Sequence, residues 1–194
     1  MLTGAEIVRK YEKADDKGRV EIICKNYPNF KGIVESCTDG LVYQIYTEHE
    51  YLRSRSKGDL GVRVQTSNIN DITQSTATSR TMIREAIVAN DFSGGELEGI
   101  ERAGEYERIS GILHIMRIDY DLFNSQITQL RDEENELFMG YLLREKDFCL
   151  IADEQNILYN SAVQKIRRIK YMIRESILEY KEFEHCIIMR KRVM

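Results

Sequence analysis

The stretch "FCLIADEQNILYNSAVQKIRRIKYMI", from Phe148 to Ile173, decides the fold of the C-terminal part of the chain. It has the pattern of a short apolar helix, a polar break and a second, longer helix. Proline, which interrupts helices, occurs once in 194 residues. From Glu96 to Glu184, apolar residues recur at spacings of three and four. We therefore predict a mainly α-helical protein, a multi-helix body that carries this pair of helices near its C-terminus.

Positive charge gathers in the second of these helices. Asn160–Arg174 holds five basic residues and no acidic one, although the whole chain has a formal net charge of -4. Residues 160–194 carry nine Lys or Arg and four Glu, a charge of +5, so residues 1–159 sum to -9. A local basic patch can bind a polyanion while the acidic remainder discourages non-specific adhesion.

A helical wheel divides the second helix into an apolar and a polar face. Ala162, Val163, Ile166 and Ile169 gather on the apolar side. The polar face and its edges carry the candidate DNA-binding residues Asn160, Ser161, Gln164, Lys165, Arg167, Arg168 and Lys170. Amide side chains can read adenine, and guanidinium groups can read guanine or hold phosphate. We expect Ser161, Gln164 and Arg168 to point at base edges, and Lys165, Arg167 and Lys170 to hold phosphates.

Two further helices are predicted before this basic helix, and their order matters for the interpretation. Asp132–Glu134 begin a predicted helix, where negative charge suits the helix dipole. In the next, two-turn helix, Ile151 and Ala152 are expected to face inward, and Asn156 can adopt a left-handed turn without being glycine. A tight helix pair whose second member is polar on its outer face is the helix-turn-helix arrangement, which we predict at about residues 130–172.

The segment "QLRDEENELFMGYLLREKDFCLIADEQNILYNSAVQKIRRI" (129–169) resembles the C-terminal DNA-binding helices of bacterial sigma factors. In that family a Leu-x-x-x-Glu-x-x-[Ile/Leu]-[Leu/Phe] helix precedes an Ile-Ala helix and a recognition helix that contains valine. Those places are occupied here by Leu130, Glu134, Leu137–Phe138, Ile151–Ala152 and Val163, while Gln155 stands where leucine is usual and Asn156 where glycine is usual.

The wider chain, including "GDLGVRVQTSNINDIT" (58–73), is similar to sigma-like regulators of Firmicutes phages and mobile elements, such as the ArpU and RinA group of late-gene regulators. That resemblance implies transcriptional control, with promoter DNA and RNA polymerase as partners.

The N-terminal half is predicted to begin with a series of helices. "TGAE" at Thr3–Glu6 has the form of a capping box, which predicts a helix start. We expect a break near Lys17–Gly18 and a short helix over residues 19–25. "NYPNF" (26–30) should end that helix, because proline disfavours helix in the residue before it. Helix is expected again through Tyr51.

Glycines and Thr, Ser and Asn residues predict an irregular segment near residues 57–71. A helix should follow, with Ile83, Ile87 and Val88 on one face, and end at "NDFSGG" (90–95). We place the main boundary there. The prediction is an N-terminal region of residues 1–93 and a helical C-terminal domain of residues 94–194.

The sequence also predicts what the protein lacks. No apolar run approaches the roughly 20 residues of a membrane span, and the N-terminus lacks the apolar core of a signal peptide. We expect a cytoplasmic protein without a membrane partner. Its scattered cysteines are expected to be free thiols: Cys24, Cys37, Cys149 and Cys186.

An enzyme is not expected. The three histidines, His49, His114 and His185, are isolated, and "EHE" at Glu48–Glu50 has no second histidine one helical turn away. Phosphate-loop, dinucleotide-binding, metalloprotease and nucleophile-elbow motifs do not occur. We therefore predict no catalytic residue, no cofactor and no metal site.

Two classes of function remain open. One is a sequence-specific DNA-binding transcriptional regulator. The other is a non-enzymatic helical interaction module, whose basic helix binds RNA polymerase or another acidic partner. We expect a homodimer, because a single helix-turn-helix contacts few bases. The apolar stripe of Ile173, Ile177 and Tyr180 needs a partner, which is either a second copy or the chain's own N-terminal half.

Overall fold

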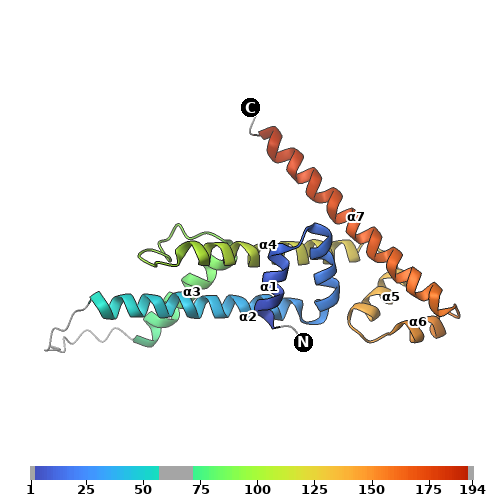
Figure 1. The fold of residues 1–194 in the computed structure, drawn as a ribbon, viewed down its shortest axis with the longest axis horizontal. Helices are drawn as coiled ribbons and strands as arrows, with labels where there is room; N and C mark the ends of the chain where they lie inside the picture. The colour runs from blue at the N-terminus through green and yellow to red at the C-terminus, as the bar shows by residue number, and fades with distance from the viewer. Residues whose placement is uncertain (1–2, 57–71, 192–194) are drawn as a thin grey trace. The chain divides into compact units, whose positions relative to one another are not determined.

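The computed structural model describes residues 3–56 and 72–191, and side chains over residues 3–55 and 76–181. In these ranges the chain forms seven helices and no strand, which confirms the mainly α-helical prediction (Figure 1). The helices are α1 (Gly4–Lys13), α2 (Asp16–Ser56), α3 (Ile72–Ala89), α4 (Ala103–Ile127), α5 (Asp132–Leu142), α6 (Phe148–Glu154) and α7 (Tyr159–Lys191). The predicted irregular segment at 57–71 lies outside the described residues. Over the described ranges, none of the helices combines the length and apolar character that crossing a bilayer requires.

Side-chain caps fix where the first two helices begin. The Thr3 hydroxyl accepts from the Glu6 amide at 3.3 Å, and the Glu6 carboxylate accepts from the Thr3 amide at 2.8 Å. This is the predicted capping box. The break before α2 falls at residues 14–15 rather than at Lys17–Gly18, and the Asp15 carboxylate accepts from the Gly18 amide at 2.8 Å.

Helix α2 continues through Pro28, so the prediction that "NYPNF" ends a helix is wrong. Proline lacks the amide that would bond to the carbonyl of Cys24. Side chains supply donors to carbonyls close to it. The Asn26 amide donates to the Ile22 carbonyl at 2.8 Å, and the Arg144 guanidinium donates to the Lys25 carbonyl at 3.0 Å. A tertiary donor of this kind cannot be read from local sequence.

The chain divides into two compact units that do not follow the predicted boundary at residue 93. The first unit comprises residues 1–8 and 32–116, and the second comprises residues 9–31 and 117–194. Helices α1, α2 and α4 contribute residues to both units. A division that runs through three helices leaves no shift of composition for sequence reasoning to detect.

The core of the first unit joins α3 to α2 and α4. Ile83 and Ile87 are buried as predicted, but Val88 is exposed and Ala86 is buried in its place. The Ser110 hydroxyl on α4 donates to the Ile87 carbonyl at 3.1 Å.

Aromatic rings link the elements of the second unit. Phe30 of α2 stacks on Tyr120 of α4 with ring centroids 5.3 Å apart. A further series of ring contacts runs through α4, α5, α6 and α7 by way of Phe123, Phe138, Tyr141, Phe148 and Tyr159. These contacts fix α5 and α6 against the start of α7.

Two of the three residues in the apolar stripe of α7 are covered by the chain itself. Ile173 and Ile177 are each 2% exposed, whereas Tyr180 is 51% exposed. The sequence left two partners open for this stripe, a second copy or another part of the same chain. The structure shows a partner within the same chain. Its burial therefore supplies no reason for a second copy of the chain.

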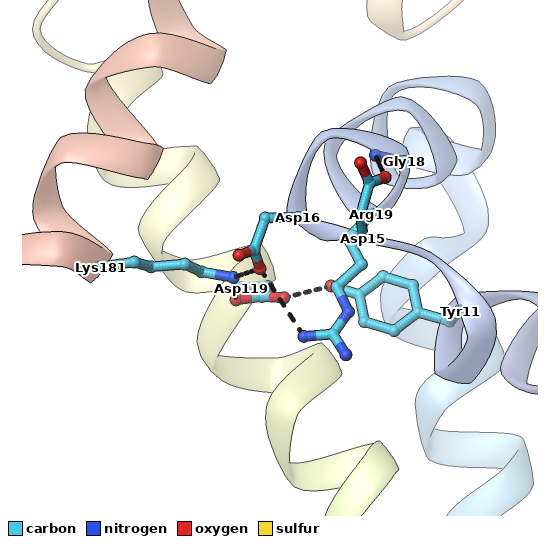
Figure 2. Close-up of polar contacts among 7 residues, drawn as sticks. All are labelled: Tyr11, Asp15, Asp16, Gly18, Arg19, Asp119 and Lys181. Atoms are coloured by element: carbon cyan, nitrogen blue, oxygen red, sulfur yellow. Dashed lines mark hydrogen bonds and ion pairs between the residues drawn. The ribbon is translucent and has the colours of Figure 1, made fainter. Parts of the chain in front are cut away.

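A buried carboxylate ties the first helices of the second unit to α4 and α7 (Figure 2). Asp119 is 4% exposed. It accepts from the Tyr11 hydroxyl at 2.6 Å and pairs with the Lys181 ammonium at 2.8 Å. Lys181 also bonds Asp16 at 2.7 Å, and Arg19 lies 3.7 Å from the same Asp16 carboxylate. Each charge in this cluster thus has an opposite charge beside it.

Ionisation in this cluster follows from burial and charge. Burial, together with the Asp119 carboxylate, raises the pKa of Tyr11 far above its ordinary value. Burial alone would lower the pKa of Lys181, but its hydrogen bonds to Asp119 and Asp16 outweigh that effect and raise the pKa overall. Both groups keep their protons throughout the neutral range.

Removing the Tyr11 hydroxyl should destabilise the protein. Tyr11→Phe leaves Asp119 without one hydrogen bond in a buried setting, so the free energy of unfolding should fall by about 1–3 kcal/mol. The matched control is Tyr43→Phe, whose ring is exposed, and it should change stability by less than about 0.5 kcal/mol. Urea unfolding measures both, and equal losses in the two variants would contradict the role given to Asp119.

Alkaline pH supplies a second test of the same hydroxyl. A group whose pKa is raised in the folded state contributes stability below its unfolded pKa and loses that stability as the pH rises further. Since the pKa of Tyr11 rises from an ordinary value of 10.0, the wild type should lose stability above that pH more steeply than Tyr11→Phe. Unfolding curves at successive alkaline pH values give the slopes, and parallel slopes would contradict the assignment.

Candidate nucleic-acid interface

Helices α5, α6 and α7 form the region where the sequence predicts DNA binding. The seven-residue α6 follows its N-cap residue Asp147, whose carboxylate accepts from the Leu150 amide at 2.8 Å. It ends in a turn over residues 155–158 that leads into α7. Asn156 has φ of 52°, which is the left-handed conformation predicted for it.

The turn closes by two backbone hydrogen bonds around Asn156. The Ile157 amide donates to the Ala152 carbonyl at 3.0 Å, and the Asn156 amide donates to the Asp153 carbonyl at 3.2 Å. This six-to-one and five-to-two pairing is a Schellman motif, which satisfies carbonyls at the end of α6. It fixes the direction in which the chain leaves α6 and enters α7.

Small and apolar residues pack α6 against α7 as the helical wheel predicted. Ile151 and Ala152 of α6 are buried, and so are Ala162, Ile166 and Ile169 of α7. Val163 is half-buried. With alanine on each helix, the two backbones can approach closely, and Leu137, Phe138 and Leu142 of α5 are buried as well.

The opposite side of α7 presents a polar stripe to solvent. The exposed residues Asn160, Ser161, Gln164, Arg167 and Arg168, called here the α7 polar stripe, follow one another at helical spacing. Over the described part of the chain, none of these side chains has a hydrogen bond, ion pair or ring contact to another residue. They are therefore available to a partner without the loss of an internal interaction.

Two of the predicted DNA-binding lysines have internal partners. Lys165 is half-buried, and its ammonium donates to the side chain of Gln155 at 2.6 Å, which ties α7 to the turn. Lys170 lies 3.6 Å from the Glu21 carboxylate and 5.4 Å from the centre of the Tyr141 ring. Burial lowers the pKa of Lys170, but Cys24, Tyr141 and Glu21 raise it by more. The structure thus brings five of the seven residues into one free stripe.

Sequence reasoning missed three exposed residues beside the stripe. Tyr171 is exposed one turn beyond Arg167 and Arg168, and continuing the helical wheel would have found it. Leu158, 78% exposed, and Tyr159 lie at the turn. Their place follows from where α7 begins, which sequence patterns give only to within a few residues.

The "EHE" residues that suggested a metal have other roles. The His49 imidazole lies 2.6 Å from the Glu96 carbonyl, and Glu48 accepts from the Tyr106 hydroxyl. Across the described residues, no three His, Cys, Asp or Glu side chains are grouped as metal ligands would be. Cys24, Cys37 and Cys149 are free thiols, while Cys186 and His185 lie outside the residues whose side chains are described.

Comparison of the chain with protein-family models, with curated proteins and with solved structures gives no match. The similarity to sigma-like regulators therefore stays a prediction, and function has to be inferred from the geometry of α5, α6 and α7.

The internal contacts of Lys170 predict a structural role for it. Lys170→Met keeps the aliphatic packing but removes the charge from Glu21 and Tyr141, so the free energy of unfolding should fall by about 1 kcal/mol. Lys31→Met, at an exposed position, is the matched control and should have little effect. If a double-mutant cycle with Glu21→Gln shows no coupling between positions 21 and 170, this role is wrong.

Proposed function

We propose that the chain is a sequence-specific transcriptional regulator that binds double-stranded DNA by placing the first turns of α7 in the major groove. The observation that carries this proposal is the α7 polar stripe, on the helix that follows a short helix and a tight turn. Its five exposed polar side chains have no partner among the residues that the structure describes. The major groove is about 12 Å wide and admits an α-helix.

The chemistry of the stripe supports reading of base edges as well as binding to the backbone. Gln164 offers a donor and an acceptor together, which suits adenine, and Arg168 offers the paired donors that suit guanine. Ser161 lies one turn before Gln164 and two turns before Arg168, on the same side of α7. In the proposed complex Asn160 and Arg167, on the edge of the stripe, contact phosphates.

The lysines have unequal parts in this proposal. Lys165 can reach a phosphate by releasing Gln155, since that contact is a single hydrogen bond. Lys170 would have to leave both Glu21 and Tyr141. We therefore keep Lys165 as a phosphate contact and assign Lys170 to the stability of the fold.

The alternative is a helical interaction module that docks on RNA polymerase or another acidic partner. Exposed apolar side chains near the stripe favour it, since Leu150, Leu158 and Tyr159 offer a surface that DNA does not need. The amide and hydroxyl groups of the stripe favour DNA, because a partner that attracts only by negative charge makes no use of them. A sigma-like regulator could use both surfaces at one promoter.

Loss of a base-reading side chain should relax sequence specificity. A preferred site would first be selected from random duplexes, and binding then measured by fluorescence anisotropy. Gln164→Ala and Arg168→Ala should each weaken binding to the selected site by about 1–3 kcal/mol, with tolerance for other bases at one position. The controls Gln44→Ala and Arg108→Ala, at exposed positions in the first unit, should bind as the wild type does.

Loss of a phosphate contact should act differently. Arg167→Ala should weaken binding to selected and scrambled duplexes alike and lower the slope of log affinity against log salt by about one. The same titrations give the stoichiometry, and hence show whether one or two chains bind each site. Equal wild-type affinity for selected and scrambled DNA at physiological salt would refute sequence-specific binding and leave the interaction module.

A further inference from the structure

A groove in the second unit lies away from the α7 polar stripe. It has a volume of about 290 Å³ and is bounded by the end of α4, the connection to α5, the start of α5 and the middle of α7. Leu130, Met172 and Ile173 give it an apolar wall, and Gln126, Arg131, Glu134 and Ser176 give it polar groups. That volume is just below the usual range for ligand sites, so only a small molecule would fit.

Gln126 is the unusual member of this lining. It is 5% exposed, and its amide nitrogen has no hydrogen-bond acceptor among the residues that the structure describes. A buried donor left without a partner costs about 1–3 kcal/mol, and buried polar groups are paired in the great majority of cases. The terminal torsion of glutamine is broad, so a small rotation can present this donor to an acceptor in the groove.

The start of α5 adds further donors beside Gln126. Arg131 is the N-cap residue of α5, and its side chain makes no cap hydrogen bond to the first amides of the helix. Its own guanidinium side chain is exposed and lines the groove. A ligand with two acceptor oxygens, such as a carboxylate, would suit these donors, which are the Gln126 amide, the Arg131 guanidinium and the first amides of α5.

The charge of the residues around the groove distinguishes between two kinds of ligand, a simple anion and a zwitterion. Asp132, Glu133 and Glu134 follow Arg131 directly, so this turn has more negative than positive charge. A ligand that is only an anion would be repelled by this excess of negative charge. A ligand that is only a cation would offer no acceptor to the Gln126 amide. A zwitterion places its carboxylate at the donors and its ammonium at Glu134, which lines the same groove.

We propose that the groove binds a free α-amino acid with an aliphatic side chain. Its carboxylate accepts from Gln126 and Arg131, its ammonium donates to Glu134, and its side chain lies against Leu130 and Met172. Since Ile173 and Ser176 of α7 also line the groove, this helix carries both the ligand site and the α7 polar stripe. The site does not depend on the proposed binding of DNA.

Calorimetric titration of the whole chain with L-leucine, without DNA, tests the proposal. Leucine should bind saturably with one molecule for each chain. Isocaproate lacks the ammonium and isopentylamine lacks the carboxylate, so each should bind about tenfold or more weakly than leucine. If leucine gives no binding heat at millimolar concentration, or if isocaproate binds as well as leucine, the proposal fails.

Two variants locate the site. Gln126→Met removes the buried donor and keeps its volume, so it should weaken leucine binding about tenfold or more and raise the thermal midpoint of the free protein. Gln44→Met, at an exposed position of α2, should change neither. Glu134→Gln should remove the preference for leucine over isocaproate. Unchanged leucine affinity in Gln126→Met or in Glu134→Gln would overturn the proposal.

Discussion

The second unit depends on one buried negative charge. Water cannot solvate Asp119 where it lies, so its carboxylate must keep its partners. These are Tyr11, more than a hundred positions earlier in the chain, and Lys181, about sixty positions later. Removing one member of a buried charge pair is far more destabilising than never having formed the pair. Packing of apolar rings would allow several arrangements of α1, α4 and α7, whereas the pairing of Asp119 with Tyr11 and Lys181 allows few. It therefore restricts the packing of α7, the helix that carries the α7 polar stripe.

Local patterns predicted local features. The capping box at Thr3–Glu6, the inward face of α6 and the left-handed Asn156 each depend on residues a few positions apart, and each was predicted from the sequence. Pro28 shows where this fails, because the prediction applied a rule for isolated helices while Arg144, far along the chain, donates a hydrogen bond to a nearby carbonyl. The two compact units divide the chain differently from the predicted boundary at residue 93, because contacts between distant segments define them.

At the candidate interface, too, sequence patterns predicted only what local spacing decides. The wheel correctly separated the buried side of α7 from its exposed side, because that separation depends only on helical spacing. It could not distinguish a free basic side chain from one already engaged. Arg167 and Lys170 are three positions apart and have the same charge, yet only Lys170 meets a carboxylate and a ring. Whether a cation is available to a ligand depends on what the rest of the chain places beside it.

The Schellman turn at Asn156 has a consequence for the kinetics of recognition. Asparagine has fewer backbone conformations in the unfolded chain than glycine has, so less entropy is lost when this turn forms. The turn is ordered when the chain folds, so in the proposed complex the α7 polar stripe is already arranged before it meets DNA. For a preorganised surface of this kind, related target sites are distinguished mainly by how long each complex lasts and much less by how quickly it forms.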